Sequence, residues 1–590
     1  MSGLSTTIGE VTTAIPEDRT QTVMVVGYGH LATAGVTYDF SSPASVVSTV
    51  GDGAAAMLAV AISKASKRLV KVLGVATSGG SAGTVTETPA GTGPTITVSG
   101  TPRYSFESVK VKITKAGAGG VGKFKYALDG VTYSEELDIP APSQATLVGT
   151  IDLSGITLST LNTKTLIMTA SVGGAQTLTF TTPADVADIA VQANAGTTNM
   201  TWSIRSGKYL VCVDDVTGAT SSLSLDASST ADTLVGMSGT AAGAAGTYTI
   251  SHTGIVLTFP ATSDYVLDTV YSFATTAPLF STSQLSTALA AARAAGERPG
   301  VVVVAEPGAD SYETNQFCDT LGTEFDSWNL LLAYPVGICG NPPADSDATV
   351  KAAWVGHEDA DMLVTGGGIY MDGGGSDTGI NGSFLVPASW YAAALAATYR
   401  YSSDLGNGEY APLTPQFSYI GPDGTTKVRD ELLASTALES SGFAVLETRP
   451  GGSPEGPWFS MGRSRANAAS KYKQWRVRRV AYRGVALVQG VLSGMRQRDF
   501  NVNTDGTLAV DAIGQIETPI RRALKIDMMD PTPSHLAGTD AAPGFQVSVD
   551  AAEVVTTTDN ITVSVDLQPK AQAETITLQV NAVDVLSGLE

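Results

Sequence analysis

The first segment that could carry chemistry is Gly27-x-Gly29-x-x-Ala32, which follows a buried-strand pattern as a dinucleotide-binding fingerprint would. That fingerprint needs a helix to begin at once, because the helix N-terminus holds the pyrophosphate. Residues 33–40 lack helical periodicity. We therefore interpret the segment as a glycine turn at the end of a strand.

Two further glycine-rich segments resemble catalytic or phosphate-binding loops. Residues 79–83 match the G-x-S-x-G nucleophile elbow, but an extended stretch follows where the elbow requires a helix. Residues 366–377 could cradle phosphate, yet they lack the Lys-Ser/Thr pair of a P-loop and their aspartates would repel phosphate. We interpret the first segment as a linker and the second as a mobile surface loop.

Histidines and cysteines are scarce, which limits both nucleophilic and metal chemistry. The chain has four histidines, and His357 at an expected helix end favours a capping or solvent-facing role over general base. Cys318, Cys339 and His357 lack the paired spacing of a zinc site, and with Cys212 they form no disulfide framework. The sequence predicts no catalytic, cofactor-binding or metal-binding residue, and a protein that is not an enzyme and needs no cofactor.

The composition indicates a large folded chain of several domains. Of 590 residues, 43% are hydrophobic and 15% charged, and the net charge is −21. Such acidity favours solubility and argues against direct binding of nucleic acid. The N-terminus lacks the basic and apolar parts of a signal peptide, and we find no apolar run of about 18 residues, so we expect no membrane insertion and synthesis in a reducing cytoplasm.

The hydrophobic pattern predicts a mixed α/β multidomain chain. Residues 1–20 are polar and indicate an extended arm, and 21–77 read as a β–α–β start. From 78 to 276 short alternating strands separated by turn signals predict inserted all-β modules, with a possible module nested at 147–237. Residues 277–458 predict an α/β domain with parallel strands at 301–305, 330–336 and 362–364, and with helices between them.

The last part of the chain predicts two helices followed by strands. Residues 464–497 and 508–524 have helical periodicity, and 545–549, 561–567 and 575–580 alternate apolar and polar residues. We expect a C-terminal domain at 459–569 and a C-terminal arm or strand at 570–590. A terminal strand and an extended N-terminal arm are suited to strand addition to a neighbouring subunit, or else they close the sheet of their own domain.

The charge distribution singles out residues 463–522, which hold twelve lysines and arginines but four acids. This basic stretch could bind nucleic acid, pack against an acidic face of another subunit, or form a solvated helix face. The second interpretation also uses the acidity of the rest of the chain. The candidate inter-subunit residues are in the two arms, the basic helix and the last strands: Glu17, Asp18, Arg476, Arg478, Arg479, Arg483, Ile561, Val563, Val565, Ile576, Leu578 and Val580.

The C-terminal third resembles the contractile tail-sheath family of bacteriophages and contractile injection systems. The order of elements carries the resemblance more than any one motif does, and Thr22–Val75 resembles the start of such proteins. Residues 386–415 follow the pattern only loosely. The matching segments are Ser441–Leu446, Trp458–Arg463, Arg476–Val480, Asn503–Thr507, Pro519–Leu524 and Asn560–Pro569.

The resemblance implies a structural subunit in the virion tail or in an injection particle, assembled in a bacterial host's cytoplasm. Subunits would form a helical homo-oligomer around an inner tail tube, linked by their arms, and would contact baseplate and tail terminator proteins. Contraction would drive the tube through a target envelope and permit genome ejection. Two alternatives stay open: an α/β enzyme binding a nucleotide or small molecule at 301–364, and another virion protein such as a decorated tail tube.

Overall fold

The computed structural model divides into two compact units. The first comprises Met1–Thr77, Leu279–Thr378 and Leu385–Glu590, and the second Ser78–Pro278 with Gly379–Phe384. The structure describes residues 22–570 apart from 67, 92, 219, 261–263, 307, 332, 374–376, 407–412, 414–415, 419–435, 448–455, 467–469, 471, 496–497, 532–533 and 559–560. The predicted N-terminal arm and the predicted strand at 575–580 lie outside the described residues.

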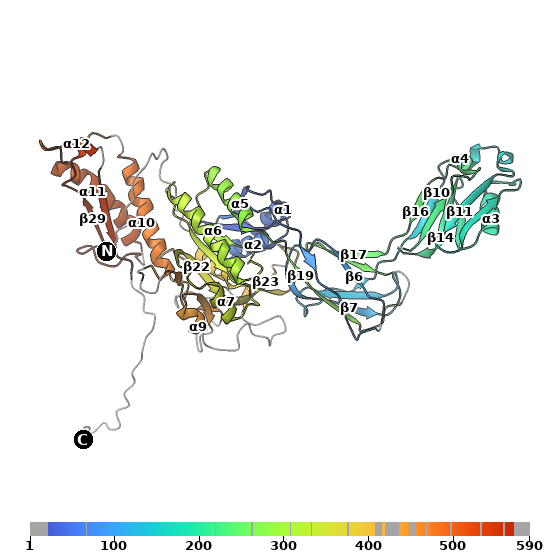
Figure 1. Cartoon of the computed structure of the whole chain (residues 1–590), viewed down its shortest axis with the longest axis horizontal. Coiled ribbons are helices and arrows are strands. Elements are labelled where there is room, and N and C mark those ends of the chain that lie inside the picture. Colours follow the sequence, from blue (N-terminus) through green and yellow to red (C-terminus); the bar gives the residue numbers. More distant parts are fainter. Residues whose placement is uncertain are drawn as a thin grey trace, which may run out of the picture. The chain divides into compact units, whose positions relative to one another are not determined.

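A mostly parallel sheet forms the centre of the first unit (Figure 1). Its order is β2-β3-β1-β20-β21-β22-β26-β27, and β28 pairs with β22. The strands from β3 to β26 run parallel, whereas β2, β27 and β28 are antiparallel to their neighbours. The strands are β1 (Val23–Gly27), β2 (Thr37–Phe40), β3 (Val70–Gly74), β20 (Val301–Val304), β21 (Val336–Gly340), β22 (Asp359–Gly366), β26 (Ala444–Glu447), β27 (Trp458–Phe459) and β28 (Ser464–Arg465).

Helices pack on this sheet because its strands are apolar on both faces, as buried parallel strands must be. One cluster joins α5, α6 and α7 to alternate residues of β1, β20 and β22. The helices α2 and α8 pack on each other and on the central strands. The helices are α1 (Pro43–Val50), α2 (Ala54–Ser66), α5 (Thr282–Ala294), α6 (Ser311–Asn329), α7 (Asp347–Ala353), α8 (Ala388–Thr398) and the short α9 (Thr436–Ser440).

Several predicted elements are confirmed with shifted ends, and two are wrong in part. Helix α5 begins after Ser281, whose hydroxyl and Gln284 form a capping box. The strand predicted at 330–336 instead begins at Val336, since α6 continues to Asn329 and Pro335 has no N–H to donate to a ladder. The long basic helix is α10 and begins at Trp475, because residues 464–465 form β28.

The C-terminal part packs two helices against a small sheet. Helix α11 contributes Ala512, Ile516, Ile520 and Leu524, at helical spacing, to a core shared with α10 and β29. The elements are α10 (Trp475–Ser493), α11 (Val510–Leu524), the short π-helix η3 (Lys525–Met529), β29 (Phe545–Val549), α12 (Val555–Thr558) and β30 (Val563–Leu567).

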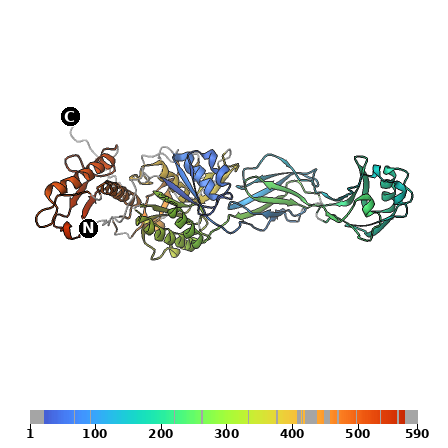
Figure 2. The same ribbon diagram turned by 90° about the horizontal axis from the view of Figure 1, so that it is seen from above.

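The second unit is built of β-strands in two groups, each seen as a separate set of strands in Figure 2. The first group pairs β4-β19-β7-β8-β9, with β5 on β19, and packs them on β17-β18-β6. Its strands are β4 (Ser81–Ala82), β5 (Thr86–Thr88), β6 (Thr97–Gly100), β7 (Phe106–Lys115), β8 (Lys123–Ala127), β9 (Leu137–Asp138), β17 (Gly246–Ile250), β18 (Ile255–Phe259) and β19 (Val270–Thr276).

The second group has its own core, formed by the sheets β10-β14-β13 and β12-β11-β15-β16 with two helices. The buried Asp214 of β14 joins the sheets by accepting hydrogen bonds from Ser171 Oγ at 2.6 Å and Ser221 Oγ at 2.8 Å. The elements are β10 (Gln144–Val148), η1 (Leu153–Gly155), η2 (Leu158–Leu161), β11 (Thr165–Ala170), β12 (Gly174–Thr179), α3 (Val186–Gly196), β13 (Met200–Arg205), β14 (Tyr209–Thr217), β15 (Ser222–Leu225), α4 (Asp232–Val235) and β16 (Thr240–Ala242).

The segment predicted as a mobile glycine loop is partly a strand. Residues 368–372 form β23, and Gly367 makes the turn from β22 with a φ of +79°. Among the described residues, no helix is long and apolar enough to span a bilayer. The strands β23 (Gly368–Asp372), β24 (Ser383–Pro387) and β25 (Phe417–Ser418) form a further small sheet.

Glu306 follows β20 and is 3% exposed at the carboxyl edge of the central sheet. Its Oε1 accepts a hydrogen bond from Tyr28 N at 2.8 Å, and its Oε2 has no partner. Burial raises the pKa of Glu306 to about 8. A carboxyl group with a raised pKa stabilises the fold fully below its unfolded pKa, and this contribution is lost as the pH rises through about 8.

We therefore expect Glu306→Gln to be more stable than the wild type at pH 9 and similar to it at pH 5. Each pKa unit corresponds to about 1.4 kcal/mol, and the pKa of Glu306 rises from 4.5 to about 8, so the gain at pH 9 is on the order of 5 kcal/mol. Tryptophan fluorescence during denaturation reports the first unit, which holds five of the six tryptophans. The exposed Glu107→Gln is the control; an equal pH dependence of Glu306→Gln and wild type contradicts the prediction.

Candidate interaction site along helix α10

The basic residues singled out in the sequence lie on α10, which contacts both β22 and α11. Because α10 lies between the central sheet and α11, little of its surface is exposed, and several of its arginine side chains are buried. Arg476 and Arg479 are each 3% exposed, and Arg483 is 8% exposed. Buried guanidinium groups must find acceptors, because an unpaired buried charge is strongly destabilising.

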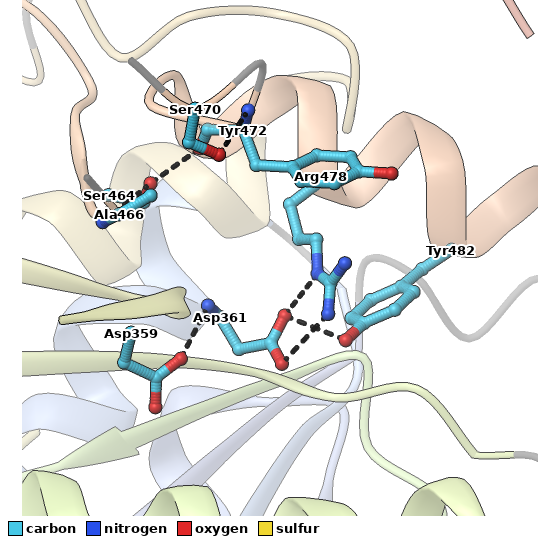
Figure 3. A network of polar contacts seen from close by, with 8 residues as sticks. All are labelled: Asp359, Asp361, Ser464, Ala466, Ser470, Tyr472, Arg478 and Tyr482. Carbon is cyan, nitrogen blue, oxygen red and sulfur yellow. Dashed lines mark hydrogen bonds and ion pairs between the residues drawn. The ribbon is translucent and has the colours of Figure 1, made fainter. Parts of the chain in front are cut away.

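Arg478 binds Asp361 of β22 (Figure 3). Its Nε and Nη2 donate to the two oxygens of the Asp361 carboxylate, the second at 3.3 Å, and Tyr482 Oη donates to Oδ1 at 2.7 Å. The guanidinium also lies over the rings of Tyr472 and Tyr482, at 4.9 and 4.4 Å from their centres. Two nitrogens on one carboxylate fix both position and angle, so this contact orients α10 on the sheet.

Asp359, two residues before Asp361, forms no ion pair within the part of the chain that the structure describes. Its Oδ1 accepts from Asp361 N at 2.7 Å, and burial raises the pKa of Asp359 to about 6. The neighbouring Asp361 carboxylate also raises this pKa, whereas Arg478 lowers it. Of the two carboxylates, Asp361 therefore forms the ion pair and Asp359 titrates near neutral pH.

The other arginines of α10 also contact groups of the same chain. Arg483 binds Asp527 of η3 through two nitrogens, at 2.8 and 2.7 Å. Arg476 Nη1 donates to the carbonyl oxygen of Lys570 at 2.7 Å. Arg479 donates to the carbonyl oxygen of Ala396, at the end of α8, and lies over the Trp475 ring. Helix α10 is thus tied to β22 of the central sheet by Arg478 and to α8 by Arg479. Arg483 ties it to η3, and Arg476 ties it to the segment that follows β30.

The structure therefore places these four arginines toward the interior of the chain, and their contact with another subunit stays a prediction. The apolar residues predicted on the last strands are half-buried, and Val563 and Val565 pair with Val549 and Val547 of β29. Ile561 packs on the same core just before β30. The remaining candidates, Glu17, Asp18, Ile576, Leu578 and Val580, lie outside the described residues.

The acceptors of these arginines were not found from the sequence. Asp361 stands in an acidic run at the start of a buried strand, where a carboxylate needs a cation, and this signal could have identified it. Asp527 and Asp361 are 44 and 117 residues from their arginines, and such separations have no sequence pattern.

The motifs considered for catalysis have structural roles in the described part of the chain. After β1 a turn leads to β2, and the first helix begins only at Pro43, as the interpretation of a glycine turn requires. A methyl group on Gly27 would lie 2.2 Å from Glu306 Oε2, so carboxylate and backbone are in close contact there. Residues 81–82 form β4, which pairs with β19.

His357 is half-buried, with 9% of its side chain exposed, so of the two predicted roles the solvent-facing one is wrong. Its ring lies 5.0 Å from that of Trp354, and its Nδ1 is 2.9 Å from Asp319 on α6. Burial lowers the pKa of His357, although Asp319 opposes this. The cysteines are free and buried, and no group of metal-binding side chains occurs among the described residues.

No family model and no curated protein matches the chain. Solved structures do match. The sheath tail protein of Listeria innocua is 11% identical over 93% of this chain and 91% of its own, with a TM-score of 0.39. The sheath tail protein of Desulfitobacterium hafniense is 10% identical over 92% and 94%, with a TM-score of 0.38.

A sheath complex of an extracellular contractile injection system, in its contracted state, is 14% identical over 52% of this chain and 76% of its own, with a TM-score of 0.35. These structural matches are to the same class of protein that the sequence resembles. At such identities and TM-scores they are similarities and not a family assignment.

We expect Arg478→Gln to lower the free energy of unfolding by about 2–4 kcal/mol, because it leaves the buried Asp361 carboxylate without its cation. Asp361→Asn should cost a similar amount, and the double variant less than the sum, since the two residues form one interaction. Denaturant unfolding followed by tryptophan fluorescence measures this. The exposed Arg498→Gln is the control. Losses below about 0.5 kcal/mol for Arg478→Gln, within the range of ordinary surface substitutions, contradict the assignment.

Proposed function

We propose that the chain is the structural subunit of a contractile tail sheath, which polymerises as a helical tube around an inner tail tube and contracts to drive it through a cell envelope. The observation that carries the proposal is the order of elements. A β–α–β start, a parallel sheet, the basic helix α10, α11 and a final strand pair follow one another as the resemblance implies.

The small C-terminal sheet supports linkage between subunits. Among the described residues β30 pairs only with β29, and an isolated pair of strands is marginal unless a further strand or helix covers it. Helix α11 covers one face. On β29 the carbonyl oxygen of Val547 accepts from Arg521 and the amide of Val549 donates to Glu517, so within the described residues the outer edge of β30 is the one that leaves backbone groups for a further strand. Residues 575–580 alternate apolar and polar residues as such a strand would. We propose that arms from neighbouring copies add to this sheet.

The arginine contacts of α10 suit a subunit that moves as one body. A contracting tube must rearrange its subunits while each keeps its internal structure, so the parts of a subunit need directional bonds between them. Arg478 on Asp361 and Arg483 on Asp527 provide two bidentate bonds at the two sides of one helix. Contacts between subunits would then fall to the arms and to the exposed surface.

The alternative of an α/β enzyme would place a ligand at the carboxyl edge of the sheet, where the strand order changes direction between β1 and β20. At that edge Gly27 and the Glu306 carboxyl group are in close contact, and Tyr28 N already donates to Glu306. This packing favours a structural role for the edge.

The inner tube, the baseplate and the terminator proteins are the partners that we propose.

We expect the full-length protein to form hollow tubes or stacked rings in negative-stain electron microscopy, and removal of residues 1–20 and 571–590 to abolish them. This deletion keeps Lys570, whose carbonyl oxygen accepts from the buried Arg476, so the monomer should keep its circular dichroism and unfolding temperature. The matched control removes residues 143–242, a module with its own core that joins the rest at neighbouring residues, and should still assemble.

Uniform small particles from the full-length chain, also in the presence of a coexpressed inner tube and baseplate, would contradict the proposal. Tubes that persist without the arms would refute linkage of subunits through the arms. The exposed surface of α11 would then be the next candidate for the contact between subunits.

A further inference from the structure

The second unit carries a face of lysines within an acidic chain. On β7 and β8 apolar residues alternate with basic ones, and Val111, Ile113 and Phe124 point into the core of the module. The alternation places Lys110, Lys112, Lys123 and Lys125 on the opposite, outer face. A register shift after Ile113 brings Lys115 to the same face, opposite Lys123. We call this the lysine face, and its members are Lys110, Lys112, Lys115, Lys123 and Lys125.

The register sets like charges directly against each other. Lys112 is the cross-strand partner of Lys125, and Lys115 that of Lys123. Directly opposite side chains in an antiparallel pair have Cβ atoms about 5 Å apart, and like charges there destabilise the sheet. Lysines often protect an exposed sheet edge, but β7 lies between β19 and β8, so edge protection does not account for them.

Acidic neighbours neutralise only part of the face. Lys112 Nζ is 2.9 Å from Asp268, and Lys123 Nζ is 3.2 Å from Glu136 and 3.8 Å from Asp138. These carboxylates are exposed, so their pairs are weak and screened by salt. Within the described residues, the lysines at 110, 115 and 125 form no ion pair. The face therefore keeps a positive charge in a chain of net charge −21.

We propose that the lysine face binds a polymer that carries repeated phosphate groups. Ammonium groups are compact point charges suited to phosphate, whereas planar carboxylates are bound by the arginine fork and nucleic-acid bases by aromatic platforms. A row of such charges on an open sheet face fits a flexible chain with charges at regular intervals. Because the face is defined by ammonium groups alone, the occupant that we propose is a free polyphosphate chain, which is recognised through its phosphates only, and a phosphorylated glycan is the other outcome that the test distinguishes. The binding does not depend on assembly of the protein.

Binding of the full-length protein is measured by isothermal titration at about 50 mM salt with phosphorylated lipopolysaccharide, with the same polymer after removal of phosphate, and with long-chain inorganic polyphosphate. We expect binding to the polymers that keep their phosphate. Comparison of the glycan titration with the polyphosphate titration shows which of the two phosphate polymers the face binds. Affinity should fall steeply with salt, as contacts to phosphate do on nucleic acids.

The test variant is Lys110→Gln with Lys125→Gln, and the matched control is Lys164→Gln with Arg205→Gln in the other module of the same unit. The test variant should bind at least about tenfold more weakly, and its slope of log affinity against log salt concentration should be smaller by about 1–2. The affinity of the control should change less than about twofold. The unfolding temperature of the test variant should be unchanged or higher, because the repulsion is relieved. Equal losses in both variants, equal binding to the phosphate-free glycan, or no binding at all would overturn the proposal.

Discussion

A buried guanidinium group needs an acceptor, and this requirement determines how the C-terminal part of the first unit is built. Helix α10 presents arginines in several directions because it lies between the central sheet and the C-terminal core. Arg478 finds Asp361 on one side, and Arg483 finds Asp527 on the other. Removing Asp527 would leave the buried Arg483 without its carboxylate, and removing Arg478 would leave the largely buried Asp361 without its cation, so the helix has one favourable position and angle. The clusters of apolar side chains provide most of the stability, and the ion pairs provide direction.

This internal use of charge changes the meaning of the basic stretch. In the sequence it suggested a surface for another subunit, and the structure shows that part of the complementary charge is in the same chain. The proposed links between copies then rest on backbone hydrogen bonds in added strands, which tolerate rotation of the bodies that they join. The proposed sheath would thus combine stiff subunits with flexible connections, and such a division suits a structure with two stable arrangements.

The sequence predicted the elements best where a local pattern decides them. The buried runs of β1, β20 and β22, the capping box at Ser281 and the amphipathic α11 are of this kind. It failed where a tertiary contact decides: apolar residues 330–331 follow α6 in an exposed position, and residues 464–465 pair with β22 although they fit a helix. The ion pairs of α10 join residues far apart in the chain, and the half-buried His357 is in contact with the ring of Trp354, so neither could be predicted from spacing.

The most direct test of the account is a cross-link between copies. Two single variants, Ser564→Cys on β30 and Thr577→Cys in the C-terminal segment, are purified separately, mixed, assembled and treated with a flexible bis-maleimide. The native cysteines are buried, so the background is low. If the arms link neighbouring subunits, a covalent dimer that contains one chain of each kind forms from the mixture, and none forms from either variant alone. A third variant carries both substitutions in one chain. If it cross-links only within single chains, at any dilution, the segment closes its own sheet, and this result would contradict linkage of subunits through their arms.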